Sequence, residues 1–219
     1  LGARTAWPQA LKPGWKASVG LGHSSPVVAG DRVYVFAREG GDEVASAYDL
    51  ATGQRAWRHS YAAPYTMNSA ATSHGPGPKS TPVVAGGRLY TFGISGTLSA
   101  FDAQTGKLVW RRTFGDQHQD TSPAFGAAQS PLVDHDRLIL HVGGDKDGAL
   151  LSLDAATGAT RWSLQGYGPG YASVVVAELD GVRQYVLQTQ SHVIGVDAAR
   201  GEALWTIPFT TPYEQNAVT

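Results

Sequence analysis

The chain has 219 residues, of which 42% are hydrophobic, and this composition is typical of a globular protein with a packed core. Its 17 basic and 18 acidic residues give a formal charge of -1 without a basic stripe, which excludes nucleic acid as a partner. The absence of cysteine excludes disulfides, a thiolate nucleophile and thiolate metal sites. The longest apolar runs, such as residues 174–177, have the length of a strand and predict no transmembrane segment.

In chain order, the first feature is an unmatched Trp15, whose surroundings resemble the end of a repeat. The sequence begins at Leu1 and its only methionine is Met67, so we expect that the natural start, with any signal peptide, has been removed. The predicted segments are an N-terminal stretch at 1–14, repeats at about 15–57, 58–110, 111–162 and 163–205, and the start of a further blade at 206–219.

The repeats share one pattern, in which a glycine follows an aspartate by four residues and a tryptophan follows that glycine by four more. The copies are Asp49, Gly53 and Trp57; Asp102, Gly106 and Trp110; Asp154, Gly158 and Trp162; and Asp197, Gly201 and Trp205. They recur at intervals of 53, 52 and 43 residues, so a fixed unit is repeated with insertions. A strand-rich period of about 40 to 50 residues predicts the blades of an all-β propeller.

Each repeat is predicted to form a four-stranded antiparallel meander, with short β-rich runs separated by turns. Strands or strand pairs are expected at 25–36, 81–92, 97–102, 107–111, 130–140, 172–176 and 182–187. The fourth repeat follows the template least closely. The aromatic residues Tyr34, Tyr90 and Phe92 occupy strand positions, which predicts core packing.

The shared pattern has a mechanical interpretation. The aspartate ends the third strand and can accept hydrogen bonds from N–H groups of the following turn, while the glycine suits a left-handed position. The tryptophan lies on the outer strand, where its apolar face needs a neighbouring blade for burial. The twelve residues are therefore predicted to be structural blade-docking residues.

The pattern resembles the tryptophan-docking motif of the pyrroloquinoline-quinone (PQQ)-type β-propellers, which include quinoprotein alcohol dehydrogenases and the outer-membrane assembly propeller lipoprotein. The resemblance extends from Trp15 to Trp205. It implies a ring of eight blades, of which this chain would be about half, and export to the periplasm. A closed four-bladed propeller is the alternative. The stretch 75–82 also looks like polyvinyl-alcohol-dehydrogenase-like propellers.

The resemblance implies a cofactor only for part of the family. Its dehydrogenases bind PQQ with Ca²⁺ in the central channel, use an aspartate base, and often carry a vicinal disulfide. This chain has no cysteine and no Asn-Asp pair that matches a calcium and base motif, so no catalytic residue is carried over. No cofactor is therefore demonstrable from the sequence, and PQQ and Ca²⁺ are expected only as an option for a full-length parent.

Ligand sites in propellers are expected where the loops between blades reach the mouth of the central channel. These loops are predicted at 20–25, 65–81, 116–130, 165–172 and 210–219. The candidate cofactor-binding residues in them are His23, His74, Lys79, His118, Asp120, Gln129 and Tyr171, and further polar or aromatic loop residues are Asn68, Asp116, Tyr167, Tyr213, Glu214 and Asn216.

Each candidate also has an ordinary structural interpretation. Lys79 would attract an anionic quinone or substrate, or it is a surface lysine, and the three histidines are otherwise hydrogen-bonded loop residues. Residues 116–120 offer oxygen and nitrogen ligands, but at no recognised metal spacing, so no metal site is predicted. Residues 145–148 resemble a fragment of a calcium loop, and a hairpin turn explains them better.

Two functions remain. The first is an exported binding or scaffold module that holds a protein or small-molecule ligand at the channel mouth. The second is the N-terminal part of a PQQ-dependent alcohol dehydrogenase, whose substrate would include polymeric alcohols. Open blade edges also predict self-association, with two half rings pairing about a two-fold axis.

Overall fold

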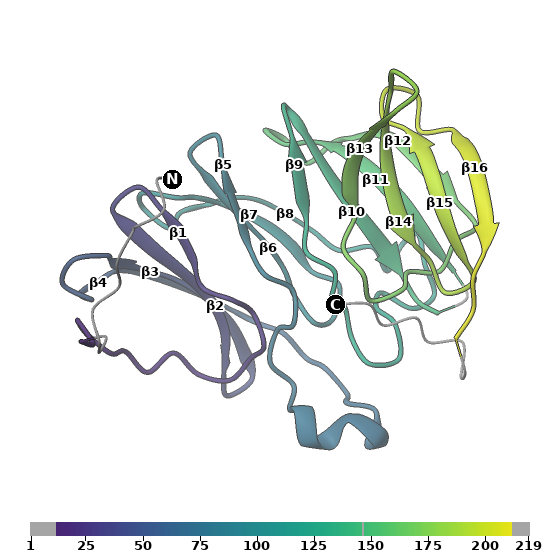
Figure 1. The fold of residues 1–219 in the computed structure, drawn as a ribbon. Helices are drawn as coiled ribbons and strands as arrows, with labels where there is room; N and C mark the ends of the chain where they lie inside the picture. The colour runs from purple at the N-terminus through teal and green to yellow at the C-terminus, as the bar shows by residue number, and fades with distance from the viewer. Residues whose placement is uncertain (1–11, 146, 212–219) are drawn as a thin grey trace.

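The computed structural model describes residues 12–145 and 147–211, and its strands form four separate four-stranded antiparallel sheets (Figure 1). We call the sheets blades 1 to 4, because they follow one another in chain order (Figure 1). Blade 1 contains β1 (Val27–Ala29), β2 (Arg32–Glu39), β3 (Asp42–Asp49) and β4 (Arg55–Ala62); blade 2 contains β5 (Val83–Ala85), β6 (Arg88–Phe92), β7 (Leu98–Asp102) and β8 (Leu108–Arg112); blade 3 contains β9 (Leu132–Asp134), β10 (Arg137–Gly143), β11 (Gly148–Asp154) and β12 (Thr160–Gln165); and blade 4 contains β13 (Val175–Leu179), β14 (Val182–Gln188), β15 (His192–Asp197) and β16 (Ala203–Pro208).

The predicted meanders are confirmed, although the first strand of each blade begins two or three residues later than predicted, and blade 4 differs most. Its first strand, β13, begins at Val175 and not at residue 172. The shift follows from the turn of Asp180 and Gly181, whose φ angles of 51° and 75° suit the tight hairpin that pairs Leu179 with Val182.

The connection between β4 and β5 contains a short 3₁₀ helix, η1 (Ser69–His74), which the strand pattern did not predict. The side chain of Asn68 caps it by accepting a hydrogen bond from the backbone N–H of Ala70 at 2.9 Å. Asn68, one of the polar loop residues noted above, therefore has a local structural role.

The repeated aspartates and glycines form the same turn in every blade. In blade 2, Oδ1 of Asp102 accepts hydrogen bonds from the backbone N–H and the hydroxyl of Thr105 at 2.8 and 2.7 Å. The N–H of Gly106, at a φ of 73°, donates to the Asp102 carbonyl at 2.9 Å. Blade 4 lacks the threonine, and Asp197 instead accepts from the N–H groups of Ala199 and Arg200 at 2.8 Å. Each turn is thus closed by its own side chain.

The hydrophobic core consists of three clusters, and each lies between two successive blades. Successive side chains along a strand point to opposite faces of its sheet, so they alternate between the preceding blade and the following blade. From β6, Tyr90 and Phe92 pack with Leu138 of blade 3, whereas Leu89 packs with Phe36 of blade 1. Tyr34, Tyr90 and Phe92 are all buried, so their predicted core packing is confirmed. The blades are therefore held face to face.

The first strands of neighbouring blades adjoin one another, with β1 beside β5 and β5 beside β9, while β4, β8, β12 and β16 are the outer strands. We call the end of the blades with the interblade connections the loop end; the β2–β3 hairpin turn and its equivalents lie there too. The opposite end, which carries the aspartate turns, we call the turn end. These two ends hold the candidate sites.

Three of the outer-strand tryptophans lie on the glycine of the next blade. A Cβ atom at Gly106 would lie 2.5 Å from the ring of Trp57, and Trp110 and Trp162 lie in the same way on Gly158 and Gly201. Trp15 lies on Gly53 of blade 1 and donates from Nε1 to the Leu50 carbonyl at 2.8 Å.

Trp205 departs from this arrangement. Its ring covers Gly195, the residue opposite it in its own sheet, and its Nε1 donates to Oε1 of Gln184 at 2.7 Å. The predicted contact of Trp205 with a neighbouring blade is therefore absent from the described residues. No blade follows blade 4 among the described residues, and Gly195 leaves room for the indole where Ala100 of blade 2 has a side chain.

Candidate binding sites at the two ends of the blades

Several interblade connections meet around Phe125 at the loop end. Nζ of Lys79 donates to the Phe125 carbonyl at 2.7 Å, and the N–H of Phe125 donates to the hydroxyl of Tyr171 at 3.3 Å. The rings of Phe125 and Tyr171 lie 6.2 Å apart, centroid to centroid. Burial lowers the pKa of Lys79. Two of the predicted residues, Lys79 and Tyr171, are thus brought together on one backbone segment.

The hairpin turn between β10 and β11 fixes the same segment from another side. Both carboxylate oxygens of Asp145 accept from the N–H of Ala124 at 3.2 Å, and Nε2 of Gln190 donates to Asp145 at 2.7 Å. Burial first, and then the negative charge of Asp145, raises the pKa of Tyr171 to about 12. We call Lys79, Phe125, Asp145 and Tyr171 the loop-end cluster. Its members come from the connection that precedes blade 2, from the connections that precede and follow blade 3, and from the β10–β11 hairpin.

His23 and His74 form a separate pair. Nε2 of His23 lies 2.8 Å from the His74 carbonyl, and the two rings are 6.0 Å apart. Both side chains are exposed. The backbone N–H of His23 donates to the carbonyl of Pro78 at 2.7 Å. Pro78 directly precedes Lys79, so this bond places His23 beside the segment that contains Lys79.

His118, Asp120 and Gln129 do not form one site. His118 is buried, its Nδ1 lies 3.1 Å from Oδ1 of Asp147, and its Nε2 has no partner among the described residues. Asp120 is exposed and lies against Gly144. Gln129 is buried and donates to the His141 carbonyl at 2.5 Å.

Metal ligation has no support among the residues that the structure describes, because no three His, Asp or Glu side chains gather into a metal-binding group there. Gly143 pairs with Gly148 across the β10–β11 hairpin, so Asp145 and Asp147 lie in its connection, and the predicted hairpin is confirmed. Tyr213, Glu214, Asn216 and the loop expected at 212–219 lie outside the described residues.

A buried glutamate at the loop end was not predicted. Oε2 of Glu43 accepts from the Tyr61 hydroxyl at 2.7 Å, and Oε1 accepts from the N–H of Ile94 in blade 2 at 2.8 Å. The guanidinium of Arg111 lies 3.8 Å from the centre of the Tyr61 ring. Burial raises the pKa of Glu43. These contacts tie blade 1 to blade 2.

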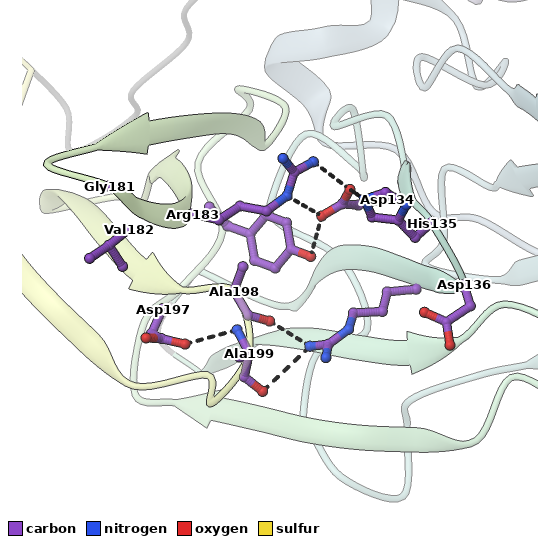
Figure 2. Close-up of a pocket in the computed structure, with 11 residues that line it drawn as sticks. Asp134, His135, Asp136, Gly181, Val182, Arg183, Asp197, Ala198 and Ala199 are labelled. Atoms are coloured by element: carbon purple, nitrogen blue, oxygen red, sulfur yellow. Dashed lines mark hydrogen bonds and ion pairs between the residues drawn. The ribbon is translucent and has the colours of Figure 1, made fainter.

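At the turn end, a recess lies at each junction between blades. The recess has a volume of about 330 Å³ between blades 1 and 2, 190 Å³ between blades 2 and 3, and 490 Å³ between blades 3 and 4. Figure 2 shows the largest recess, with Arg183 and Asp134 on one side and Ala198 on another. We call it the 3/4 recess.

Asp134 forms a polar link in the 3/4 recess. It accepts from Nε and Nη2 of Arg183 at 3.1 and 2.6 Å and from the Tyr185 hydroxyl at 2.9 Å. Hydrogen bonding from Arg183 lowers the pKa of Asp134, while burial and then Asp134 raise that of Tyr185. Ala29 and Ala85 occupy the position of Asp134 in blades 1 and 2. Comparison of the repeats in the sequence could therefore have identified Asp134 as an unusual residue.

The indole of Trp162 makes a further exception at the same junction. At the other junctions the indole N–H binds the carbonyl that follows the repeated aspartate, as Trp110 does with Ala155 at 3.2 Å. Here Nη1 of Arg137 donates to the equivalent carbonyl of Ala198 at 2.5 Å. Nε1 of Trp162 is buried and has no hydrogen-bond partner among the described residues.

Comparison with known proteins gives a family match over almost the whole chain. Residues 4–80 and 41–219 match the sequence profile of the family described as outer membrane protein assembly factor BamB. The outer membrane protein assembly factor BamB of Kangiella koreensis is 32% identical over 121 residues, which are 55% of this chain and 27% of the relative. The polyvinylalcohol dehydrogenase of a Sphingopyxis species is 33% identical over 91 residues, which are 32% of this chain and 14% of that enzyme.

The crystal structure of BamB from Moraxella catarrhalis is similar in fold, with a TM-score of 0.56 and 17% sequence identity over 88% of this chain and 50% of that one. The predicted PQQ-type β-propeller with four-stranded blades is confirmed. The chain spans about half the length, or less, of these relatives. None of the described helices is long and apolar enough to span a membrane.

Proposed function

Because the chain belongs to the family of the outer membrane protein assembly factor BamB, we propose that it is a binding module that holds a protein partner at its loop end. The relatives' printed name associates them with the assembly of outer membrane proteins, and this supports a partner from that assembly process. The same name supports export to the compartment that faces the outer membrane.

The observation that carries the proposal is the loop-end cluster. Phe125 is held by Lys79 from one side and by Tyr171 from another, and the adjoining Ala124 is held by Asp145. Connections between different blades are thereby fixed relative to one another. A prearranged surface loses little conformational freedom when a partner binds, which favours binding.

Site-directed photo-crosslinking of the full natural protein in its own bacterium tests this proposal. A photoreactive residue at Lys79 is expected to capture a component of the outer-membrane-protein assembly machinery. A photoreactive residue at Arg55, an exposed position on the outer strand β4, is the matched control. Equal capture of that component at both positions, or none at Lys79, contradicts the proposal.

The tryptophans would support this function by holding the blades in place. We propose that Trp57, Trp110 and Trp162 dock each blade on the next, so that the loop end keeps its shape. Trp15 would do the same for blade 1.

Part of a PQQ-dependent alcohol dehydrogenase is the second candidate, favoured by the 33% identity to the Sphingopyxis polyvinylalcohol dehydrogenase. No three His, Asp or Glu side chains gather into a metal-binding group among the described residues, and this candidate therefore concerns PQQ and Ca²⁺ in the full natural protein. The test adds PQQ and Ca²⁺ to the full natural protein. Quinone absorbance that stays with the protein, together with dye reduction by an alcohol, would favour this candidate over the first.

A second copy of the chain is the partner we propose for the outer face of blade 4. Val175 and Ile207, on that face, are 55% and 56% exposed, and the equivalent faces of blades 1 to 3 are covered by a following blade. Burial of this face by a second copy would continue the same packing. Light scattering is expected to show a dimer, and a monomer at high concentration contradicts this part of the proposal.

A further inference from the structure

Trp15 makes with blade 1 the contacts that Trp57 makes with blade 2. Its ring lies on Gly53, and its Nε1 donates to the Leu50 carbonyl at 2.8 Å, in the residue that follows the aspartate of the turn. Trp57 covers a glycine and bonds a carbonyl at the matching positions of blade 2. The Trp15 ring also stacks on Tyr48, with 6.3 Å between the ring centroids. We call Gly53, the Leu50 carbonyl and Tyr48 the Gly53 seat.

Every glycine seat in the described part of the chain is filled, and Trp205 has none. Trp57, Trp110 and Trp162 lie on the turn glycines of blades 2, 3 and 4, and Trp15 fills the seat of blade 1. Trp205 has the same place on the outer strand of its blade, yet its ring lies against its own sheet. A tryptophan suited to an interblade seat therefore remains without one.

The first and last blades expose the two halves of an interblade junction. On blade 1, Val28 is 59% exposed, whereas the equivalent Val84 of blade 2 packs against blade 1. On blade 4, Val175 is exposed, whereas the equivalent Val83 of blade 2 packs against blade 3. Blades 1 and 4 lie at opposite ends of the row (Figure 1), so these two faces are complementary only between separate copies, in a head-to-tail contact.

We propose that Trp15 competes with Trp205 of a second copy for the Gly53 seat, and that the segment 12–20 thereby restrains head-to-tail association of the chain. At each inner junction, the seat is filled from the outer strand of the preceding blade. The strand β16 of an arriving blade 4 would thus need the space that the segment 12–20 occupies. The inference rests on the proposed pairing with a second copy, for which it names the receiving surface and the competitor.

The competition determines how tightly two copies associate. A seat that is filled by its own chain is open in only a fraction of the molecules, and the apparent affinity for a second copy falls by that fraction. Loss of Trp15 removes this reduction, whereas loss of Trp205 removes the incoming indole. Trp15 belongs to none of the three core clusters, so the blades are expected to fold without it.

Sedimentation equilibrium of the 219-residue chain measures this effect. Trp15→Ala is expected to associate at least about tenfold more tightly than the unmodified chain. Lys16→Ala, at an exposed position of the same segment, is the matched control and should leave the association unchanged. Adding Trp205→Ala to Trp15→Ala should cancel the gain, because no indole then enters the seat.

A peptide separates the seat from unspecific association of exposed apolar surface. The peptide acetyl-Lys-Pro-Gly-Trp-Lys-Ala-Ser-Val-Gly-amide repeats residues 12–20 and is expected to fill the empty seat of Trp15→Ala. It should therefore reverse the gain in association. The same peptide with alanine in place of tryptophan is the control and should have no effect.

Three results would overturn the proposal: association of Trp15→Ala no tighter than that of the unmodified chain, a gain that persists after Trp205→Ala, or a gain that both peptides leave unchanged. The proposed pairing fails separately, if the unmodified chain stays monomeric at high concentration. In that case, association of Trp15→Ala that depends on Trp205 would still support the competition.

Discussion

Nε1 of Trp57 donates a hydrogen bond to the carbonyl of Ala103 in the next blade at 2.9 Å, although 46 residues separate them. The indole that makes this bond is buried and covers Gly106. Because Ala103 follows the repeated Asp102 directly, the turn that closes one blade also receives the tryptophan of the blade before it.

Replacing Trp57 with alanine should destabilise the fold strongly. The change removes a buried aromatic side chain and the bond to Ala103, so a loss of about 3–5 kcal/mol in the free energy of unfolding is expected. Urea unfolding measures it. Trp205→Ala is the control, since Trp205 contacts its own sheet, and its loss should be clearly smaller. Equal losses would contradict an interblade role for Trp57.

Gly106→Ala tests the receiving surface for that tryptophan. The new Cβ atom would lie 2.5 Å from the Trp57 ring at a φ of 73°, so both a steric clash and backbone strain are expected. Gly86→Ala adds a Cβ atom into open space at a φ of 56° and has only the strain, about 1 kcal/mol. Thermal unfolding should therefore show a greater decrease for Gly106→Ala, and equal decreases would argue against the clash.

The Asp134 link predicts a stability that depends on acid pH. Arg183 lowers the pKa of Asp134 below its ordinary value of 3.8, so the ionised form stabilises the folded state above that value. This contribution is lost as the pH falls through the lowered pKa. Compared with Asp134→Asn, the unmodified chain should be more stable at pH 6, and the difference should shrink below about pH 4. Urea unfolding at both pH values checks this, and a constant difference contradicts it.

The buried His141 should make the stability of the fold depend on pH in a second, higher pH range. Burial lowers its pKa from 6.5 to about 4, and its Nε2 lies 2.8 Å from the Tyr167 carbonyl. Between these values the unfolded chain binds a proton that the folded chain does not, so stability falls as the pH decreases from 6.5 to 4.

His141→Gln should reduce this slope, because glutamine does not titrate, although it can still donate to the Tyr167 carbonyl; burial also lowers the pKa of His59, which keeps part of the slope. His23→Gln, at an exposed position, serves as the control and should keep the slope. Unfolding measured across this pH range decides the point, and an unchanged slope in His141→Gln would refute it.

The strands were predictable because their signals are local. Gly86 and Gly87 mark the β5–β6 turn, and the alternation of apolar residues marks the faces that meet the neighbouring blades. The site was less predictable. Lys79 and Tyr171 were named from their loops, but their common attachment to Phe125 depends on residues 46 positions away on either side. His118 was named as a loop histidine, and only the fold shows that it is buried.

By itself, the sequence determined the blade, because Asp102, Gly106 and their equivalents act within one turn and recur in register. The tertiary structure alone decided which junction differs. The sequence contains Arg88 and Arg137 at matching strand positions, yet only Arg137 takes the carbonyl without the indole. At the junction of blades 2 and 3, Arg88 and Trp110 share the Ala155 carbonyl, so the difference depends on how the Trp162 indole is placed over blade 4, and that placement is fixed only when the blades pack.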